Sequence, residues 1–246
     1  MKKIESVANP NIKNVVKLHD AKNRKEKKLF IAEGLRVCQT LIESSLKIEQ
    51  LYCTEKMIKE AKKLTHEYHI ILVSEAIMKK IAATTTPSGI LGVFHIPSVV
   101  VPSKLQSGAV LANITDPGNM GTLIRSSVAF GFTQIVIVEG CDPWNQKVVQ
   151  ASAGTIGFAQ IILMSWHNLK NIKTRPSLAA LVPSDGIAIN SKSKHLLIIG
   201  NEAHGIPTPW LAECDKQITL SMKGPAESLN AAIAGSIALY EMSKNF

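Results

Sequence analysis

The sequence predicts an α/β protein of two domains, and three observations lead to that prediction. Short apolar runs of the kind that form buried strands alternate with segments of helical periodicity along nearly the whole chain. Hydrophobic residues make up 46% of the 246 residues and charged residues 19%, which is enough apolar material for a large core. A stretch rich in proline and serine after Pro97 coincides with a sharp fall in net charge. We therefore expect two α/β domains, with a mostly parallel, doubly covered sheet in the second.

The first domain is expected over residues 1–97. Residues 4–48 have the apolar spacing of two helical segments, the first of which begins at Asn9-Pro10. The elements expected next are a strand at 48–53, a helix at 55–64, a strand at 69–73, a helix at 75–82 and a strand at 90–96. Residues 98–107 are expected to form a linker, because prolines and serines interrupt the periodic pattern there.

The alternation restarts after the linker, so residues 108–246 form the second expected domain. Strands are expected at 109–114, 134–138, 161–164, 178–182, 186–189, 196–199 and 217–220, and helices at 119–130, near 147–153, near 169–174 and at 229–243. The helix over 119–130 is expected to begin with Asn119 as its N-cap and to end at Gly131. Its buried face is expected to carry Met120, Leu123, Ile124 and Ser127.

Several classes of protein are excluded by what the sequence lacks. No apolar run is long enough for a membrane span, and no apolar segment follows the N-terminal lysines, so we expect neither a membrane protein nor a secreted one. The 4 cysteines form no CxxC pair, which predicts a reducing, cytoplasmic setting and no metal site. The sequence also lacks GxGxxG, GxxxxGK[ST], HExxH and GxSxG motifs, which argues against the common nucleotide-binding, zinc-protease and hydrolase sites.

The charge of the chain points to a polyanionic partner. The formal net charge is +9, and residues 1–100 carry most of it, with 17 basic and 10 acidic side chains, a net of +7. The excess is concentrated in Lys13, Lys17, Lys22, Arg24, Lys25, Lys27 and Lys28. A cluster of this kind is typical of a nucleic-acid-binding surface, and the alternative is a solvated helix face.

Three polar segments follow apolar strands in the second domain, where ligands of open α/β sheets bind. The first, DPGNMGTLIR, contains Asn119 and Arg125. Arg125 lies about 240° further round a helix than Asn119 and roughly 9 Å along it. The two side chains therefore cannot grip one small group from a single helix face. Either Arg125 is a surface charge, or it serves a ligand that approaches from a neighbouring element or subunit.

The second and third segments offer further polar groups. In IIGNEAHGIP, Gly200 would let a flat ligand approach the main chain, and Glu202 is either a site carboxylate or a capping or solvent-facing acid. In SMKGPAESLNAAIAGSIALYE, Ser228 can cap a helix that is apolar nearly all round. Such a helix is buried on every side, either at a subunit interface or in the centre of the core.

Taken together, the segments DPGNMGTLIR, IIGNEAHGIP and SLNAAIAGSIALYE resemble motifs one, two and three of the SpoU (TrmH-type) RNA 2′-O-ribose methyltransferases of the SPOUT superfamily. The upstream segments SVANPNIKNVVKL, NRKEKKLFIAEG and TPSGILGVF resemble the N-terminal, ribosomal-protein-like substrate-binding domain of the same family. The resemblance therefore covers nearly the whole chain. It implies a C-terminal domain with a trefoil knot, S-adenosylmethionine as methyl donor, an RNA substrate and a homodimer formed through the C-terminal domains.

The resemblance also assigns roles to single residues. It implies that Asn119 and Arg125 are the catalytic pair of motif one, that Glu202 is the acid of motif two, and that Ser228 and Asn230 are the polar residues of motif three. Gly200, Leu220 and Leu229 match positions where the family holds the donor. In the N-terminal domain the recurrent positions are Asn9, Arg24 and Glu33, with Arg24 the best candidate for an RNA contact, and the charge pattern adds Lys13, Lys27 and Lys28.

The function that we predict is methyl transfer from S-adenosylmethionine to a ribose 2′-hydroxyl of structured RNA, with ribosomal RNA favoured because the two-domain layout resembles that branch of the family. The alternatives are a transfer-RNA methyltransferase, a methylase acting on another polyanion-associated substrate, and a non-catalytic RNA-binding assembly factor with the same fold.

Overall fold

The computed structural model describes residues 1–98, 102–189, 194–225 and 228–244. The chain divides into two compact units, and the N-terminal unit comprises Met1–Ser98 together with Asp142–Gly157. The C-terminal unit comprises the rest of the described chain. Residues 142–157 thus pack with the N-terminal unit although they fall within the range predicted for the second domain. The predicted linker lies partly outside the described residues, and the predicted domain boundaries stay predictions.

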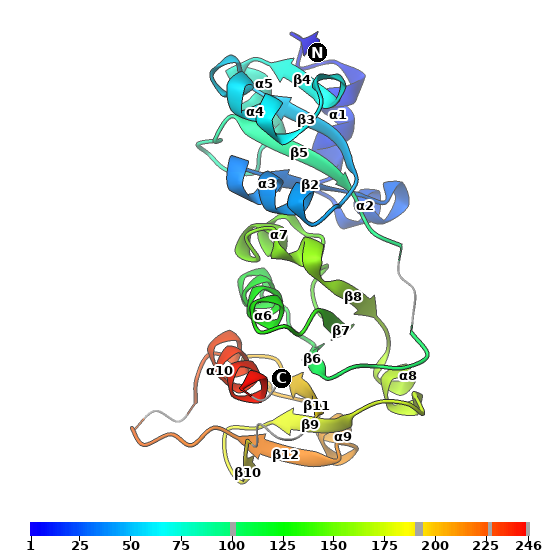
Figure 1. The fold of residues 1–246 in the computed structure, drawn as a ribbon, viewed down its shortest axis with the longest axis vertical. Coiled ribbons are helices and arrows are strands. Elements are labelled where there is room, and N and C mark those ends of the chain that lie inside the picture. Colours follow the sequence, from blue (N-terminus) through cyan, green and yellow to red (C-terminus); the bar gives the residue numbers. More distant parts are fainter. Residues whose placement is uncertain (99–101, 190–193, 226–227, 245–246) are drawn as a thin grey trace. The chain divides into compact units, whose positions relative to one another are not determined.

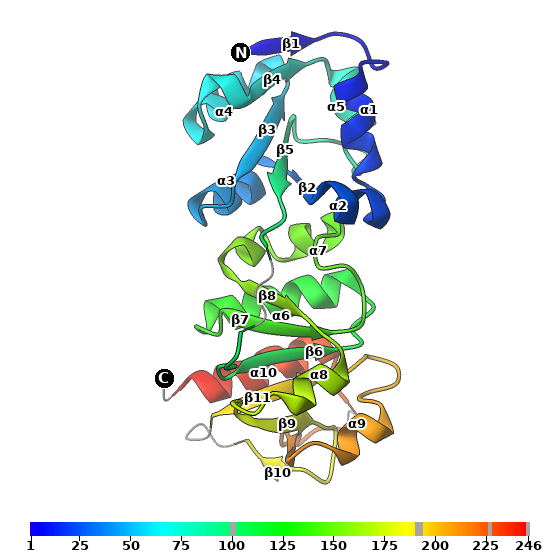
Figure 2. The same ribbon diagram turned by 90° about the vertical axis from the view of Figure 1, so that its right-hand side faces the viewer.

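A five-stranded sheet forms the centre of the N-terminal unit. Its strands are β1 (Lys2–Ile4), β2 (Leu29–Glu33), β3 (Ile48–Cys53), β4 (Ile70–Val73) and β5 (Ile90–His95), in the order β1-β4-β3-β5-β2. Strand β5 is antiparallel to β2 and β3, and the other pairs are parallel. The helices are α1 (Pro10–Lys17), α2 (Ala21–Lys27), α3 (Leu35–Glu43), α4 (Ile58–Leu64), α5 (Glu75–Ile81) and α7 (Gln146–Ala151). Helices α1 and α5 lie on one side of the sheet, and α3 and α4 on the other (Figure 2).

The prediction of two helical segments over residues 4–48 was wrong in part. Helices α1 and α3 match the two predicted segments, but β1, α2 and β2 were not predicted. Strand β2 has only five residues, and a short apolar run cannot be told from a piece of helix by its periodicity. Its strand conformation is fixed by antiparallel pairing with β5, which lies some sixty residues further along the chain.

A seven-stranded sheet forms the centre of the C-terminal unit. Its strands are β6 (Gly108–Ala112), β7 (Gln134–Val138), β8 (Gln160–Leu163), β9 (Ser177–Leu181), β10 (Ile187–Ala188), β11 (His195–Ile199) and β12 (Lys216–Thr219), in the order β10-β12-β9-β11-β6-β7-β8. Every neighbouring pair is parallel, which confirms the predicted parallel sheet. The carboxyl ends of the strands therefore meet at one edge, and the loops after β6, β11 and β12 leave from that edge.

Helices cover both faces of this sheet. Helices α6 (Pro117–Ala129) and α10 (Ala231–Ser243) lie on one face, and α8 (Trp166–Asn171) and α9 (Thr208–Ala212) on the other (Figure 1). The strands β6, β7 and β11 are buried along their whole length, as a doubly covered parallel sheet requires. Within the described ranges no helix is both long enough and apolar enough to cross a lipid bilayer.

Close packing of α10 against α6 and β11 depends on a glycine. A Cβ atom at Gly235 would lie 2.6 Å from Leu123 Cδ2 of α6 and 2.7 Å from Ile199 Cδ1 of β11. Because both neighbours are buried, any larger side chain would push α10 away from the sheet. Helix α10 is therefore held close to α6, which carries the first polar segment, and to β11, which leads into the second.

Candidate active site

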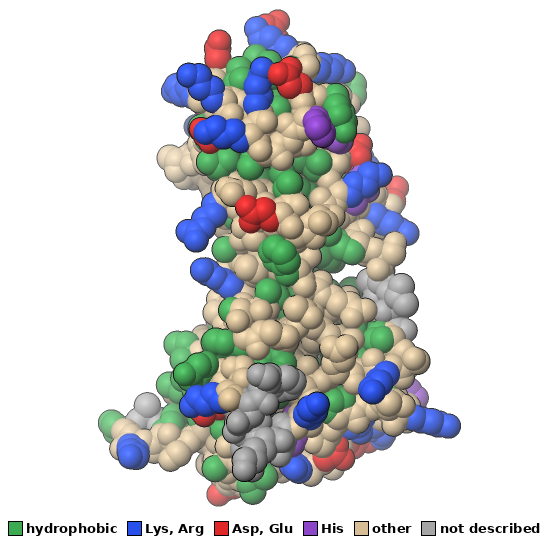
Figure 3. Space-filling model, in the orientation of Figure 1, with side chains coloured by type: hydrophobic (Ala, Val, Ile, Leu, Met, Phe, Trp, Pro, Cys, Tyr) green, Lys and Arg blue, Asp and Glu red, His purple; other side chains and the backbone are tan. Residues whose placement is uncertain are grey.

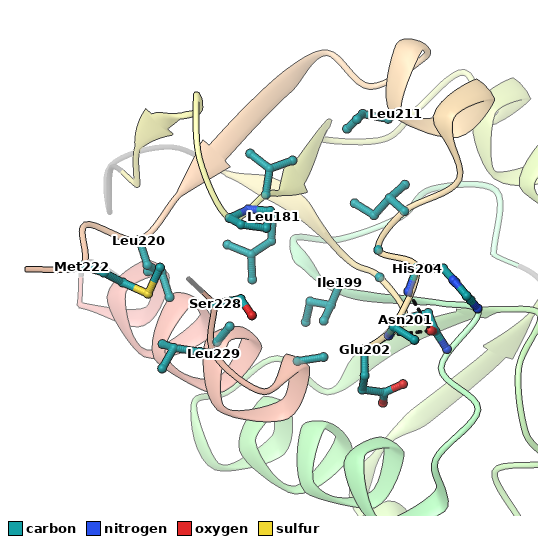
Figure 4. A pocket seen from close by; sticks show the side chains of 18 residues that line it. Leu181, Ile199, Asn201, Glu202, His204, Leu211, Leu220, Met222, Ser228 and Leu229 are labelled. Atoms are coloured by element: carbon teal, nitrogen blue, oxygen red, sulfur yellow. Dashed lines mark hydrogen bonds between the residues drawn. The ribbon is translucent and has the colours of Figure 1, made fainter. Parts of the chain in front are cut away.

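A cavity of about 480 Å³ opens at the carboxyl edge of the seven-stranded sheet. Its apolar lining includes Leu181 of β9, Ile199 of β11 and, from the segment between β12 and α10, Leu220 and Leu229 (Figure 4). Its polar lining includes Glu202 and Ser228, and residues 200–206 all border it. The volume lies within the range of small-molecule sites, and an apolar slot with few polar groups suits a ligand with a flat apolar part and a charged part. We call this cavity the donor pocket, after the methyl donor that the sequence leads us to expect there.

The loop after β11 forms one wall of the donor pocket, and Asn201 holds it in shape. The main chains of Asn201 and Gly205 exchange two hydrogen bonds of 3.0 and 2.9 Å. The Asn201 side chain is buried, accepts hydrogen bonds from the backbone of Ala203 and His204, and donates to Asn113 O and Thr115 Oγ1 at 3.1 Å each. Asn201 thus ties the loop after β11 to the loop after β6. Sequence reasoning assigned this residue no role, although an asparagine two positions after a buried strand was a usable signal.

Gly200 is required by the loop itself. A Cβ atom there would lie 2.5 Å from Gly205 C and 2.6 Å from Ile206 N, and both atoms are main chain. Because backbone atoms of a folded-back loop cannot move aside cheaply, only glycine fits without reshaping the wall of the donor pocket. The predicted role of Gly200, close approach of a flat ligand, stays a prediction beside this local reason.

Three of the predicted catalytic side chains are joined by hydrogen bonds. Asn119 Nδ2 donates to Glu202 Oε1 at 2.6 Å, and Asn230 Nδ2 donates to Asn119 Oδ1 at 3.1 Å. Asn230 Oδ1 in turn accepts from the backbone N–H groups of Ala232 and Ile233 in the first turn of α10. We call the chain of contacts from Glu202 through Asn119 to Asn230 the amide relay. It fixes the position of the carboxylate beside the donor pocket through elements that are far apart in sequence.

The helix caps differ from those predicted. Helix α6 begins at Pro117, and its N-cap is Asp116, whose Oδ1 accepts from the backbone N–H of Asn119 at 2.7 Å. Asn119 therefore lies inside the first turn, and its side chain is available to Glu202 instead of to its own backbone. Similarly, Asn230 and not Ser228 caps α10. Proline favours the first helical position and aspartate the cap, so DPGN begins its helix before the asparagine. The predicted end at Gly131, with φ +85°, and the predicted buried face of α6 are confirmed.

Arg125 stands apart from the other predicted catalytic residues. Its side chain is exposed on α6, it does not line the donor pocket, and within the described residues it makes no hydrogen bond or ion pair. The next residue, Ser126, hydrogen-bonds to Ser236 of α10 at 2.7 Å, so Arg125 emerges close to the contact between the two helices. The geometry agrees with the expectation that Asn119 and Arg125 do not grip one group from the same face.

The residues predicted to bind RNA fall into two groups. Lys13, Lys27 and Lys28 are exposed, whereas Arg24 and Glu33 are only 3% and 5% exposed. Arg24 donates twice to Asp142 Oδ2, at 2.8 and 2.6 Å, and also to the carbonyls of Leu18 and His19.

The carboxylate of Glu33 accepts hydrogen bonds from Gln146 Nε2 at 2.9 Å, from Thr84 Oγ1 and from the backbone of Ala83. Asn9 caps α1 by accepting from the backbone of Asn11. Arg24, Glu33 and Asn9 thus all have partners within the N-terminal unit, and the RNA-binding role expected of them stays a prediction.

Comparison with known proteins gives matches over both parts of the chain. Residues 108–240 match the SpoU rRNA Methylase family, and residues 9–92 match the MRM3-like substrate binding domain. The chain is 26% identical over 260 residues to the 23S rRNA (guanosine(2553)-2′-O)-methyltransferase RlmP of Bacillus subtilis, with 98% of this chain and 99% of that protein covered. A 23S rRNA (uridine(2479)-2′-O)-methyltransferase of Streptomyces viridochromogenes is 24% identical, with 86% of this chain and 81% of that protein covered.

Solved structures agree over the same length. The AdoMet-bound rRNA methyltransferase from Sinorhizobium meliloti superimposes with a TM-score of 0.84 at 26% identity, covering 98% of this chain and 97% of that one. The SpoU methyltransferase AviRb from Streptomyces viridochromogenes, in complex with AdoMet, has a TM-score of 0.79 at 23% identity, covering 96% and 98%, which is a likeness of fold.

Proposed function

The chain belongs to the SpoU rRNA methylase family, and from that premise we propose that it transfers the methyl group of S-adenosylmethionine to a ribose 2′-hydroxyl of structured RNA, with ribosomal RNA the favoured substrate. The observation that carries the proposal is the convergence of three polar segments on one cavity. Gly200, Leu220 and Leu229 line the donor pocket together with Glu202, and the amide relay fixes that carboxylate.

The donor pocket fits S-adenosylmethionine in its chemistry. The donor combines a flat adenine, a ribose, a sulfonium cation and a short methylene arm that ends in an ammonium and a carboxylate, and when bound it supplies an electrophilic methyl group. Leu220 and Leu229 would enclose its apolar parts. The Glu202 carboxylate lies in the same lining and would favour its positive charge over a neutral competitor. Main-chain groups of residues 200–206 that are not already paired within the loop would meet its polar edges.

In the reaction the ribose 2′-oxygen forms a bond to the methyl carbon, the carbon–sulfur bond breaks, and the hydroxyl proton leaves to a base. Holding the two reactants in line can supply much of the reduction in barrier. Asn119 is held by hydrogen bonds on both its amide oxygen and its amide nitrogen, so it is fixed beside the donor pocket. We assign it the alignment of the ribose, with Ser228 as a second polar contact at the cavity.

Arg125 is assigned a different task. A guanidinium keeps its proton at neutral pH, so it is a poor base but a good bidentate partner for a phosphate or a ribose. Its exposed position on α6 suits a substrate that approaches from outside the donor pocket. We therefore assign Arg125 the grip on the RNA backbone beside the reacting ribose.

The proposal includes a homodimer formed through the C-terminal unit and the trefoil knot of the family. Helix α10 buries Gly235, Ala238 and Leu239 against its own unit and yet exposes a second apolar face. On that face Ile233, Ile237 and Tyr240 are 52%, 41% and 49% exposed. Their spacing of four and three residues places them on one side of the helix. An exposed apolar stripe of this kind favours a second copy of the chain as its partner.

We also place the protein in the cytoplasm. Cys38, Cys53 and Cys214 form no disulfide. Burial raises the pKa of the Cys38 thiol to about 12 and that of Cys53 and Cys214 to about 11, so these thiols stay protonated and unreactive. Thiols of this kind fit a reducing compartment.

The proposal is tested by calorimetric titration of the full chain with S-adenosylmethionine and by mapping 2′-O-methyl groups in ribosomal and transfer RNA from cells with and without the protein. We expect donor binding and the loss of a methyl group from ribosomal RNA. Loss from transfer RNA alone would favour the transfer-RNA alternative. Donor binding with no lost methyl group would favour an assembly factor, and no donor binding would contradict the proposal.

Arg125→Ala provides a sharper test of the assigned roles. Because Arg125 does not line the donor pocket, we expect methyl transfer to be abolished while the affinity for S-adenosylmethionine is nearly unchanged. Calorimetry and a tritium-transfer assay on ribosomal RNA measure the two quantities separately. Unchanged turnover would refute the grip on RNA that we assign to Arg125.

A further inference from the structure

A second cavity, of about 390 Å³, lies in the N-terminal unit on the sheet face that α1 covers. All five strands contribute to it, through Lys2 of β1, Ile71 of β4, Gln50 and Tyr52 of β3, Val93 of β5 and Leu29 of β2. The strand register explains why these side chains meet, because Lys2 pairs with Ile71, Ile71 with Tyr52, and Gln50 with Val93. The cavity lies on the same sheet face as the buried core, at the edge of that core. We call it the N-terminal pocket.

The floor of the N-terminal pocket is apolar and well ordered by packing. Ile71 and Val93 belong to the buried core cluster of this unit, as do Val15 of α1 and Leu18 at its C-cap, which also line the cavity. Side chains that are locked in a core offer a rigid surface, so little conformational entropy is lost when a flat ring binds over them.

Amide groups, two cations and the carboxylate of Glu49 surround this floor. Asn11 and Asn14 of α1 and Gln50 of β3 line the pocket, and each amide can both donate and accept hydrogen bonds. Lys2 and Lys27 line it as well, and Lys27 Nζ donates to Asn14 Oδ1 at 3.1 Å. Other lysine and arginine side chains spread over the surface of the same unit (Figure 3).

An aromatic side chain completes the lining. Tyr68 lines the pocket although it is 72% exposed, and its ring lies beside those of His66 and His69, with centroids 5.6 and 4.2 Å away. A tyrosine ring left open to solvent at the edge of a cavity offers a face on which a nucleobase can stack.

Strand β3 is irregular where it meets the pocket. Its pairing with β5 shifts between Ile48 and Gln50, so that Glu49 is an extra residue in the strand. Bulges re-aim the side chains around them and occur often beside functional sites. Both residues at the bulge line the cavity, and the carboxylate of Glu49 also lies 2.8 Å from His95 Nε2, which holds it at the rim.

We propose that the N-terminal pocket holds one unpaired nucleotide of the RNA substrate, with the base over the apolar floor beside Tyr68 and the phosphate near Lys2 and Lys27. This inference rests on the proposed function, since it names where that RNA is read. Sequence-specific recognition of RNA uses bases that are splayed out of the helix, stacked on aromatic rings and hydrogen-bonded on their edges. The amides of Asn11, Asn14 and Gln50 supply the edge contacts. A paired base in an A-form duplex could not enter a cavity of this kind.

The test compares the binding of two RNA probes by fluorescence anisotropy. One is a short, labelled, unstructured RNA strand of mixed sequence, and the other is the same strand annealed to its complement. We expect Tyr68→Ala to weaken binding of the single strand by roughly five-fold or more, the lower end of what loss of one stacked base does, and to leave the duplex unaffected. Tyr68→Phe keeps the ring and should restore most of the affinity. Because Tyr68 is largely exposed, neither variant should change the melting temperature.

Lys27→Ala gives an independent reading of the phosphate contact. It should lower the slope of log affinity against log salt by about 0.7, the value for one phosphate of a single strand. Lys59→Ala, an exposed lysine on α4 across the sheet, is the matched control and should leave the slope nearly unchanged because it is outside the pocket. Photocrosslinking with 4-thiouridine-containing RNA should label the peptide that contains Tyr68.

A parallel titration with S-adenosylmethionine distinguishes a failure of this inference from a failure of the proposed function. If the donor binds and RNA is methylated, but Tyr68→Ala and Tyr68→Phe bind the single strand like the wild type and crosslinks avoid Tyr68, the inference is overturned and the function stands. If the Tyr68 variants behave as expected but the donor does not bind, the pocket is a nucleotide site and the methyltransferase proposal fails.

Discussion

In the C-terminal unit, Asn119, Glu202 and Asn230 come from three separate segments. Glu202 lies 83 positions after Asn119 and Asn230 lies 111 positions after it, and yet two hydrogen bonds join the three side chains beside one pocket. In the N-terminal unit, the residues predicted to bind RNA lie within 25 positions of one another, yet they separate into buried and exposed groups. Sequence distance therefore does not decide which side chains act together. In a parallel sheet the strand ends meet at one edge, so the chemistry gathers there, whereas a basic helix distributes its charges around its axis.

The same contrast separates two uses of a charged side chain. Arg24 is a buried ion that Asp142 and two carbonyls neutralise, so its guanidinium stabilises the docking of residues 142–157 within the N-terminal unit. The rings of Phe30 and Trp144 pack in the same contact, with centroids 4.9 Å apart and planes tilted by 42°. Lys13 and Lys27 lie at the surface, where their charges remain available to a partner. The variants below test whether the buried cation is structural and whether the exposed cations bind RNA.

The largest effect is expected from Arg24→Ala. Removing the buried guanidinium leaves the partly exposed Asp142 and the carbonyls of Leu18 and His19 without their donors, and should lower the free energy of unfolding by about 3 kcal/mol. Chemical denaturation followed by circular dichroism measures this loss. Lys25→Ala, an exposed neighbour on the same helix, is the control and should change stability by less than about 0.5 kcal/mol. Equal stability of the two variants would contradict a structural role for Arg24.

Asn119→Ala should reduce the rate of methyl transfer by roughly 100-fold, because a displacement of the reacting ribose by about 1 Å has an effect of that size. The affinity for S-adenosylmethionine should change little, since Asn119 does not line the donor pocket. Single-turnover assays and calorimetry measure the two quantities. Thr122→Ala, at an exposed position of α6, keeps the relay intact and should retain full turnover. A variant of Asn119 that loses donor binding and turnover equally would show that the relay only supports the loop.

Gly200→Ala should weaken donor binding by about tenfold, as an overpacked position strains its surroundings by one or more kcal/mol. The added methyl group would meet main-chain atoms of Gly205 and Ile206, so the wall of the donor pocket must move. Gly224→Ala is a matched control, because a Cβ atom there meets nothing within 4 Å. Calorimetry on both variants decides whether loop shape controls donor affinity, and equal affinities would show that it does not.

The parallel sheet and the strand-end segments could be predicted from the sequence because each depends on a local signal, whereas the donor-binding roles of Gly200, Leu220 and Leu229 were predicted only from the resemblance to the family. Continuous apolar runs predict buried parallel strands, and DPGN, GNE and SLN mark the loops that leave them. What could not be predicted depends on partners far along the chain. Strand β2 is fixed by β5, Arg24 is buried by Asp142, and Asn201 acquires its role only through Asn113 and Thr115. No periodicity within a segment contains that information.

The smallest effect on RNA affinity is expected from the loss of a single exposed lysine. Comparing lysines at two positions shows whether the total charge of the protein or the place of the charge controls RNA binding. Lys13→Ala removes one cation from the surface of α1 and should weaken RNA binding only a few-fold, while lowering the salt slope by about 0.7 per lost phosphate contact. Lys59→Ala removes the same charge from α4, on the other side of the sheet (Figure 2), and leaves the net charge of the variant identical. If RNA is held only by the overall positive field, the two variants lose affinity equally. If RNA contacts the α1 side of the sheet, only Lys13→Ala changes the slope, because counterion release counts local contacts and not total charge.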